Sequence, residues 1–462
     1  MNYQFPAAFM LHSFSMTALM IVFALGGEPV IAADVGLVHG VTVALFYVFS
    51  ANARNLLLNP HALISARFLL IQRMFLVVPL AAIAFYLSLI SEVGIGLASI
   101  LILRRCVEWL NEVLMSEAER QDDRAYAVNF ITIQSFLLLA LVISFMVEGY
   151  MPWWGLLIWA ISPLASGRGY LRDTLEKQET ALRLVWSRLL PYFGSTAIIG
   201  ITVYVFRLFL VLLTGKETAG DLFTAFALGG IAGSVFANAL GPSMVLQEMR
   251  TGGRSFPLPF RWGMSLLVLL GVLLIVAATW QPALLEWTGK SAFFWEATGL
   301  SMIGGVIMVF AQRMRLRLLQ EDENCDVFGP DVLINILVIA SIPFLKWLMG
   351  KEILTALYLI SSVLALAFYF SASKQDLLWQ GVFQRWSNRV KTSLAVMLFF
   401  PIFFQASGGI FRHPFNNFDS GGLPSQLPIP LLSVFACYGG IMLLGIHRLS
   451  RISLSFIFSA LF

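Results

Sequence analysis

Residues 262–280 read WGMSLLVLLGVLLIVAATW, an apolar stretch without a charged side chain. Its length is close to the roughly 20 residues that an α-helix needs to cross the hydrocarbon core of a bilayer. A strand of a membrane β-barrel would instead alternate apolar and polar residues over about ten positions. Because a spanning segment must pair its own backbone polar groups, this stretch predicts a membrane-spanning helix.

The same kind of stretch recurs along the whole chain. Of all residues, 58% are hydrophobic and 12% are charged, whereas soluble domains carry roughly 25% charged residues. We therefore expect an all-α polytopic membrane protein with about 14 transmembrane helices. The expected spans are residues 7–26, 36–53, 74–91, 93–112, 128–148, 151–167, 191–213, 221–246, 262–280, 296–312, 329–348, 353–373, 392–410 and 429–446.

Basic residues indicate how these spans are oriented. With the N-terminus inside and the sides alternating, 24 of the 30 Lys and Arg residues fall on the cytoplasmic side and five on the outer side. Cytoplasmic connections are enriched in Lys and Arg, and one miscounted span would destroy this asymmetry. The sequence thus predicts an even number of spans with both termini in the cytoplasm. The N-terminus lacks a basic region before its apolar stretch, so we expect a retained span and not a cleaved signal peptide.

The sequence contains few signs of catalysis or metal binding. Its cysteines (106, 325, 437) and histidines (12, 39, 61, 413, 447) are scattered, and their spacing fits neither a disulfide framework nor a metal site. The motifs of zinc proteases, serine hydrolases and P-loop proteins are missing. No basic run interleaved with aromatic residues indicates a nucleic-acid partner. We therefore expect no enzyme activity, no metal and no cofactor.

A short internal repeat predicts two halves of equal orientation. Residues 49–56 read FSANARNL and residues 236–243 read FANALGPS, which places Asn52 and Asn238 186 residues apart. This pattern favours two six-helix lobes in parallel repeat, one of the common transporter plans. We expect an N-lobe at 1–167, an amphipathic cytoplasmic linker helix at 168–190, a C-lobe at 191–373, and two extra C-terminal spans with a cytoplasmic tail at 374–462.

Arg207 is the most informative single residue, because it interrupts the apolar run 203–213. A charged side chain at such a depth costs a few kcal/mol and is expected to face a water-filled cavity or a partner. A cavity would make Arg207 a binding site for phosphate, which a guanidinium contacts with two hydrogen bonds. The alternatives are a structural ion pair, or a side chain that reaches the outer interface.

Other polar residues at the span ends are weaker candidates. Arg54, Arg104 and Arg105 either capture an anionic headgroup at the inner leaflet or only mark topology. Arg104 also lies four residues before Glu108 and eight before Glu112, which predicts either an inner gate or a simple pair on one helix face. We expect hydrogen bonds between helices from Asn52 and Asn238. Close packing or helix bending is expected at Gly229, Gly230 and Gly233. The carboxylates expected at the membrane interfaces are Glu148, Glu296 and Asp331.

Residues 207–228, RLFLVLLTGKETAGDLFTAFAL, resemble the hairpin between spans seven and eight of polysaccharide flippases. These flippases belong to the multidrug/oligosaccharidyl-lipid/polysaccharide exporter superfamily. Arg207 matches the family arginine and Ala219-Gly220 match its turn. Phe206 replaces the usual acidic partner, and Asp221 precedes the aromatic residue, which departs from the pattern.

This resemblance implies a flippase for undecaprenyl-pyrophosphate-linked oligosaccharides, such as O-antigen units of lipopolysaccharide. Such a protein works by alternating access in the bacterial inner membrane and contacts its lipid-linked substrate and membrane lipids. The site residues would be Arg207, Arg54, Arg104, Arg105, Asn52 and Asn238. A multidrug/cation antiporter of the same superfamily and a membrane polysaccharide polymerase or ligase are the alternatives. The sequence does not indicate the sugar or the coupling ion. It also leaves the oligomeric state open, and a monomer is one of the states it allows.

Overall fold

The computed structural model describes residues 4–50, 53–58, 65–176, 186–241, 244, 245, 248, 258–321 and 328–373. Every regular element in these residues is a helix. Together they belong to one compact unit, residues 1–373. The two C-terminal spans expected at 392–410 and 429–446 lie outside the described residues.

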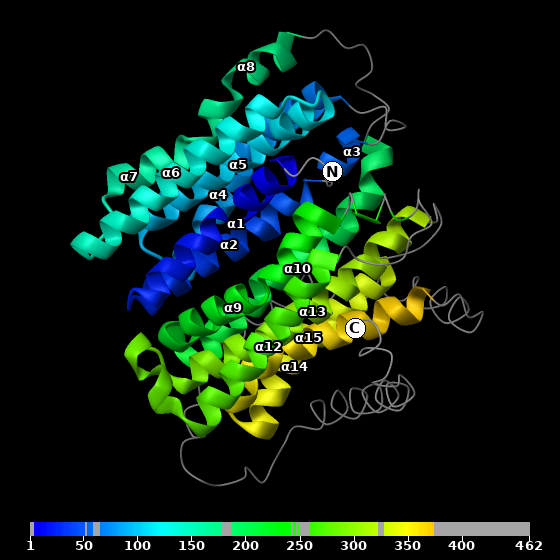
Figure 1. Cartoon of the computed structure of the whole chain (residues 1–462). Helices are drawn as coiled ribbons and strands as arrows, with labels where there is room; N and C mark the ends of the chain where they lie inside the picture. Colours follow the sequence, from blue (N-terminus) through cyan, green and yellow to red (C-terminus); the bar gives the residue numbers. More distant parts are fainter. Residues whose placement is uncertain are drawn as a thin grey trace. The chain divides into compact units, whose positions relative to one another are not determined.

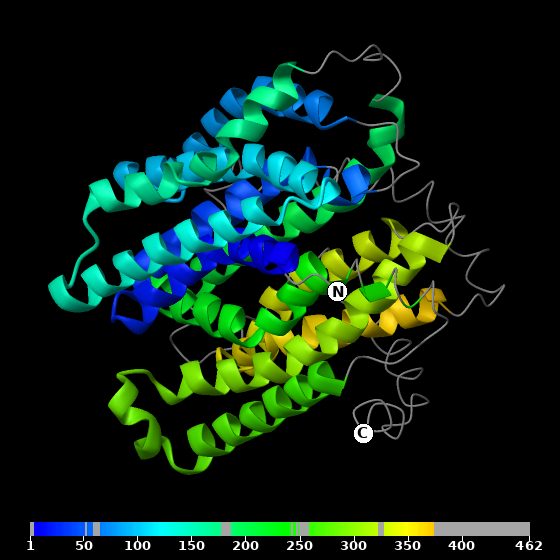
Figure 2. The same cartoon turned by 45° about the horizontal axis from the view of Figure 1, so that its top comes forward.

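We call α1 to α8 the N-terminal half and α9 to α15 the C-terminal half, each visible as a group of neighbouring helices (Figures 1 and 2). The elements of the N-terminal half are α1 (Gln4–Leu25), α2 (Pro29–Val48), α3 (Ala53–Leu58), α4 (Ala66–Ile90), α5 (Ile95–Arg120), α6 (Arg124–Glu148), α7 (Trp153–Ile161) and α8 (Pro163–Glu176). Those of the C-terminal half are α9 (Trp186–Gly229), α10 (Ile231–Val235), the π-helix η1 (Phe236–Leu240), α12 (Leu258–Trp280), η2 (Pro282–Thr288), α13 (Ala292–Glu321), α14 (Phe328–Met349), η3 (Glu352–Ala356) and α15 (Leu357–Ser373).

Each of the first twelve expected spans coincides with helix in the structure. Within the described residues, nine helices are long and apolar enough to cross a membrane. Helix α5 carries too many charges to be among the nine, α7 is too short, and α9 contains two expected spans. The chain is therefore an all-α polytopic membrane protein, as the sequence predicts.

Two span boundaries differ from the sequence prediction for identifiable reasons. Helix α2 begins at Pro29 and not at residue 36, because proline at the first helical position needs no hydrogen-bond partner for its nitrogen. This earlier start places Asp34 inside the second spanning helix. The expected span 151–167 is divided at Ser162 between α7 and α8, and Pro163 begins the second of these helices.

The hairpin between spans seven and eight turns at Gly215, so the expected turn at Ala219-Gly220 is wrong. Gly215 has φ 78° and ψ 166°, a combination that is open essentially only to glycine. Ala219 and Gly220 are helical instead. Gly220 has no side chain because the backbone of Pro29 and Ala33 in α2 occupies that space.

The two halves contact each other most extensively along α2 and α9. Glycines permit this approach: Gly40 lies against Tyr204 and Arg207, and Gly200 lies against the backbone of Val43 and Ala44. Inside the halves, α5 packs against most helices of the N-terminal half and α13 against most of those in the C-terminal half. Residues of α2, α5 and α9 can therefore meet where the halves touch.

The glycines expected to allow close packing or bending do so. Helix α9 ends at Gly229, and the chain continues through α10 into the π-helix η1. A side chain at Gly229 would collide with Ser301 and Met302 of α13. Helix bending at such residues is common where a π-helix interrupts the regular pattern.

Candidate functional site

Arg104 is held entirely inside the N-terminal half. Its Nε donates to Glu108 Oε1 at 2.6 Å and its Nη1 to the carbonyl of Trp159 at 2.6 Å. Arg104 is 0% and Glu108 1% exposed, and the guanidinium also covers the Trp159 ring at 4.4 Å. Arg104 and Glu108 thus form the pair on one helix face that their spacing predicts.

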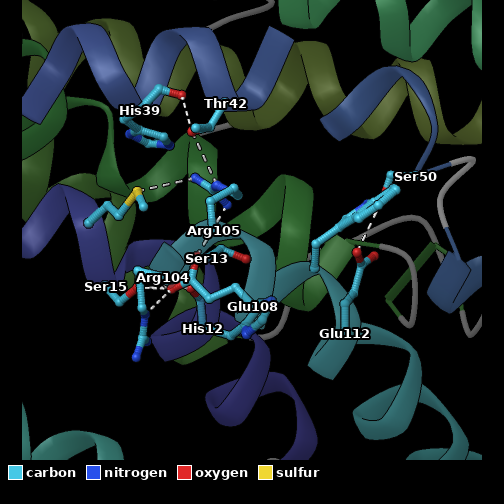
Figure 3. Close-up of polar contacts among 12 residues, drawn as sticks. His12, Ser13, Ser15, His39, Thr42, Ser50, Arg104, Arg105, Glu108 and Glu112 are labelled. Atoms are coloured by element: carbon cyan, nitrogen blue, oxygen red, sulfur yellow. Dashed lines mark hydrogen bonds and ion pairs between the residues drawn. The ribbon is translucent and has the colours of Figure 1, made fainter. Parts of the chain in front are cut away.

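Glu112 does not extend this pair into a row of charges. It forms an ion pair with Arg73 of α4 at 3.0 Å and accepts a hydrogen bond from Ser50 at 3.1 Å. Figure 3 shows Glu112 separated from the Arg104–Glu108 pair and directed toward Ser50. The two carboxylates of α5 therefore hold different helices, and no pattern in the sequence indicates the Arg73 contact.

Arg54 joins the two stretches of the internal repeat. Its Nε and Nη2 donate to both oxygens of Glu119 at 2.7 and 2.8 Å, and its guanidinium covers the Phe9 ring at 4.2 Å. Its Nη1 reaches the carbonyl of Ala239 in η1 at 3.4 Å. Arg54 therefore contacts the residue that follows Asn238. Asn52 and the side chain of Asn238 lie outside the described residues.

Arg207 lies between the two halves and points at α2. It donates to the carbonyl of Gly36, and its guanidinium lies 5.6 Å from the centre of the Phe223 ring. Within the described residues it has no carboxylate partner and is partly exposed. Arg207 lies eight positions before the turn at Gly215, or about 12 Å along the helix, which is near the middle of a bilayer core about 30 Å thick.

Arg105 approaches the same face of α2 from α5. It donates to Thr42 Oγ1 at 3.3 Å and lies 3.4 Å from Glu108 Oε2, with 15% of its side chain exposed. Figure 3 shows Arg105 extended from α5 toward Thr42, with His39 beside it. Gly36, His39 and Thr42 follow one another at three-residue spacing, so they share a helix face.

This site, which we call the α2 cationic site, consists of Arg105, Arg207 and His39. Both guanidinium groups act electrostatically on the His39 imidazole, and on each other. Arg104 brings a third positive charge, while Glu108 is the carboxylate that pairs with both arginines of α5. Since Glu108 compensates one charge, the site has an excess of positive charge that favours a bound anion.

Of the acidic residues expected at the interfaces, one is buried. Asp331 lies in the first turn of α14, is 0% exposed and accepts from Arg315 at 2.9 Å and from Tyr369; its interfacial position stays a prediction. Glu148 is exposed at the end of α6. Glu296 lines a cavity of about 250 Å³ in the C-terminal half, and this cavity contains none of the expected site residues.

Sequence reasoning missed His39 and the bonds of Lys216 and Lys346, which are two of the five basic residues expected on the outer side. Lys216 forms an ion pair with Asp34 at 2.8 Å and donates to the carbonyl of Glu92 at 2.8 Å. Lys346 donates to the carbonyl of Leu213 at 2.6 Å, so two lysines hold the region of the Gly215 turn. For both His39 and Asp34, the signal in the sequence that could have identified them was a polar residue within an apolar run.

No family model matches the chain, and no curated protein matches it. Among solved structures, it is similar to one described as a MATE in the bent conformation, with 14% identity and a TM-score of 0.49 over 84% of this chain and 95% of that chain. It is also similar to the eukaryotic MATE transporter AtDTX14, with 11% identity and a TM-score of 0.43 over 80% of this chain and 93% of that chain. Because both scores are below 0.5, neither likeness indicates what this chain does.

Proposed function

We propose that this protein is a flippase that moves an undecaprenyl-pyrophosphate-linked oligosaccharide across a bacterial inner membrane by alternating access. The observation that carries the proposal is the excess positive charge of the α2 cationic site. Two arginines from different helices meet there, and one of them, Arg207, has no carboxylate partner among the described residues. The cytoplasmic orientation of both termini and the inner-membrane location belong to the same proposal.

A membrane interior does not keep such charges without a compensating group. Burial of an unpaired charge is costly, and intramembrane arginines face partners or aqueous paths. A diphosphate supplies two or more negative charges and several acceptor oxygens, which match the fork of donors on each guanidinium. Binding at the contact between α2, α5 and α9 would also let the substrate respond to relative movement of the two halves.

A multidrug/cation antiporter is the second candidate, and one observation favours it. A cation needs a deep carboxylate, and Asp34 lies inside α2 while Glu108 is buried on α5. Both carboxylates are already paired, with Lys216 and with Arg104 and Arg105. A cationic drug would have to displace these partners, whereas an anion would meet the excess positive charge of Arg105 and Arg207, so we prefer the flippase.

The test is complementation of a strain that lacks the gene, with Arg207→Ala, Arg105→Ala and, as a matched control, Arg124→Ala. Arg124 has 62% of its side chain exposed and pairs only with the adjacent Asp122 among the described residues. We expect both site variants to lose surface polysaccharide and to accumulate undecaprenyl-linked units inside, at membrane levels equal to the control. Normal surface polysaccharide in Arg207→Ala would refute the site.

The same strains separate the alternatives. Increased drug susceptibility of the deletion strain, with normal surface polysaccharide, would support the antiporter. Single repeat units already attached outside would support a polymerase or ligase, although the longest expected outer loop, residues 411–428, is short for a catalytic domain.

A further inference from the structure

His39 is placed to contact whatever binds between Arg105 and Arg207. It lies on α2 between Gly36, whose carbonyl accepts from Arg207, and Thr42, whose hydroxyl accepts from Arg105. Its own carbonyl accepts from the Thr42 hydroxyl at 3.0 Å. Its Nδ1 is buried and has no hydrogen-bond partner. Such an atom is normally satisfied by water, an ion or a ligand.

The charges around the imidazole all have the same sign. Arg105 from α5 and Arg207 from α9 act on it, while α1 and α4, which also pack against α2, contribute no charged group to it among the described residues. Glu108, the carboxylate of α5 that pairs with Arg105, is engaged with both Arg104 and Arg105. The two guanidinium groups disfavour a positive charge on the imidazole, and an anion bound between them would offset this repulsion.

We propose that His39 is the third ligand of the anion at the α2 cationic site and that it takes up one proton from water when a diphosphate binds. This inference rests on the proposed function and adds the way in which pH controls the site. Protonation converts the imidazole into a donor at both nitrogens. Both N–H groups can then face anionic oxygens. The second N–H bond forms as an O–H bond of water breaks, the buffer neutralises the hydroxide, and no other covalent bond changes.

Proton uptake makes the binding of a diphosphate depend on pH. A binding step that takes up one proton weakens about tenfold for each unit by which the pH rises above the range where the free imidazole is protonated. A site with arginines alone would keep its affinity over the same range, because guanidinium groups stay charged.

The experiment is calorimetric titration of the purified full chain in detergent with farnesyl diphosphate, a soluble prenyl diphosphate, at pH 7.5. Titration in PIPES and in Tris, whose ionisation enthalpies differ, gives the number of protons taken up per diphosphate bound. We expect wild type to take up about one proton more than His39→Gln or His39→Asn. Both variants should elute as the wild type does in size exclusion and should bind with little pH dependence.

His12→Gln is the matched control, because His12 is a buried histidine of α1 that also has an unpartnered Nδ1. It should keep the proton uptake of wild type. Equal proton uptake in wild type and His39→Gln, or loss of uptake in His12→Gln alone, would overturn the inference. Failure of wild type to bind the diphosphate at all, or unchanged binding in Arg207→Ala, would instead refute the proposed function.

Discussion

Removal of the Glu108 charge tests how the arginines of α5 are shared between structure and function. In Glu108→Gln, Arg104 keeps its contact with the Trp159 carbonyl but loses its carboxylate, at 0% exposure. Removing one partner of a buried ion pair costs about 3–5 kcal/mol, because the other charge stays buried and uncompensated. For a chain of 462 residues, this corresponds to a fall in Tm of about 3–10 °C.

The reverse substitution should cost less, for a reason specific to this site. In Arg104→Met, Glu108 keeps Arg105 at 3.4 Å and the hydroxyl of Ser15. The double variant Arg104→Met, Glu108→Leu removes both charges and should recover at least half of the loss, since apolar replacements of buried pairs are often neutral. We also expect Arg104→Met to support transport, in contrast to Arg207→Ala.

The assay is thermal unfolding in one detergent at pH 7.5, followed by the fluorescence of the 12 tryptophans. Asp122→Asn serves as the control, because the Asp122–Arg124 pair is 63% and 62% exposed and should leave Tm unchanged. A loss of Tm in Arg104→Met as large as that in Glu108→Gln would refute the sharing of Glu108 between the two arginines. A double variant less stable than both single variants would refute the charge argument itself.

Two further predictions concern the turn between spans seven and eight. Lys216→Met removes the bonds to Asp34 and the Glu92 carbonyl. Such a pair contributes about 1 kcal/mol, so its loss should increase the population in which α2 and α9 separate about fivefold. In a chain without its native cysteines, a cysteine introduced at Ala33 should then react about fivefold faster with an impermeant maleimide. An unchanged rate would mean that this ion pair does not hold the two halves together. Gly215→Ala forces a side chain into a conformation that costs about 1–3 kcal/mol and should lower Tm, whereas Gly169→Ala, where nothing lies within 4 Å of the added carbon, should not.

The sequence was sufficient for the helices because their cause is local. Continuous apolar runs of the length of a bilayer core leave helix as the available structure, and twelve such runs coincide with helix in the described residues. The ends of the helices depend on particular residues. Helix α2 begins at Pro29, earlier than predicted, and the turn lies at Gly215 and not at the predicted Gly220. At Gly220 the absence of a side chain serves contact with α2 and not the turn.

The pairing of the arginines could not be predicted, because it depends on how α5 is rotated against its neighbours. Arg104 and Arg105 are adjacent in sequence, yet their directions differ by the roughly 100° that one helical residue turns. That rotation sends Arg104 toward Trp159 within the N-terminal half and Arg105 toward Thr42 on α2. Spacing predicted the Arg104–Glu108 pair because both ends lie on one helix, while the Arg73–Glu112 contact needs the packing of α4 on α5.

Positive charge near a membrane interface has two roles in this chain, and partner choice separates them. Arg54, Arg73 and Arg104 fit the rule for cytoplasmic ends, and each is held by a carboxylate of α5. Arg207 lies too deep to mark topology, and a backbone carbonyl holds it instead. A guanidinium held by a carbonyl keeps its full charge for a further ligand, whereas one paired with a carboxylate does not. This difference, more than depth alone, makes Arg207 the residue whose loss should most directly abolish transport. Arg105 shares Glu108 with Arg104 and therefore keeps part of its charge for the same ligand.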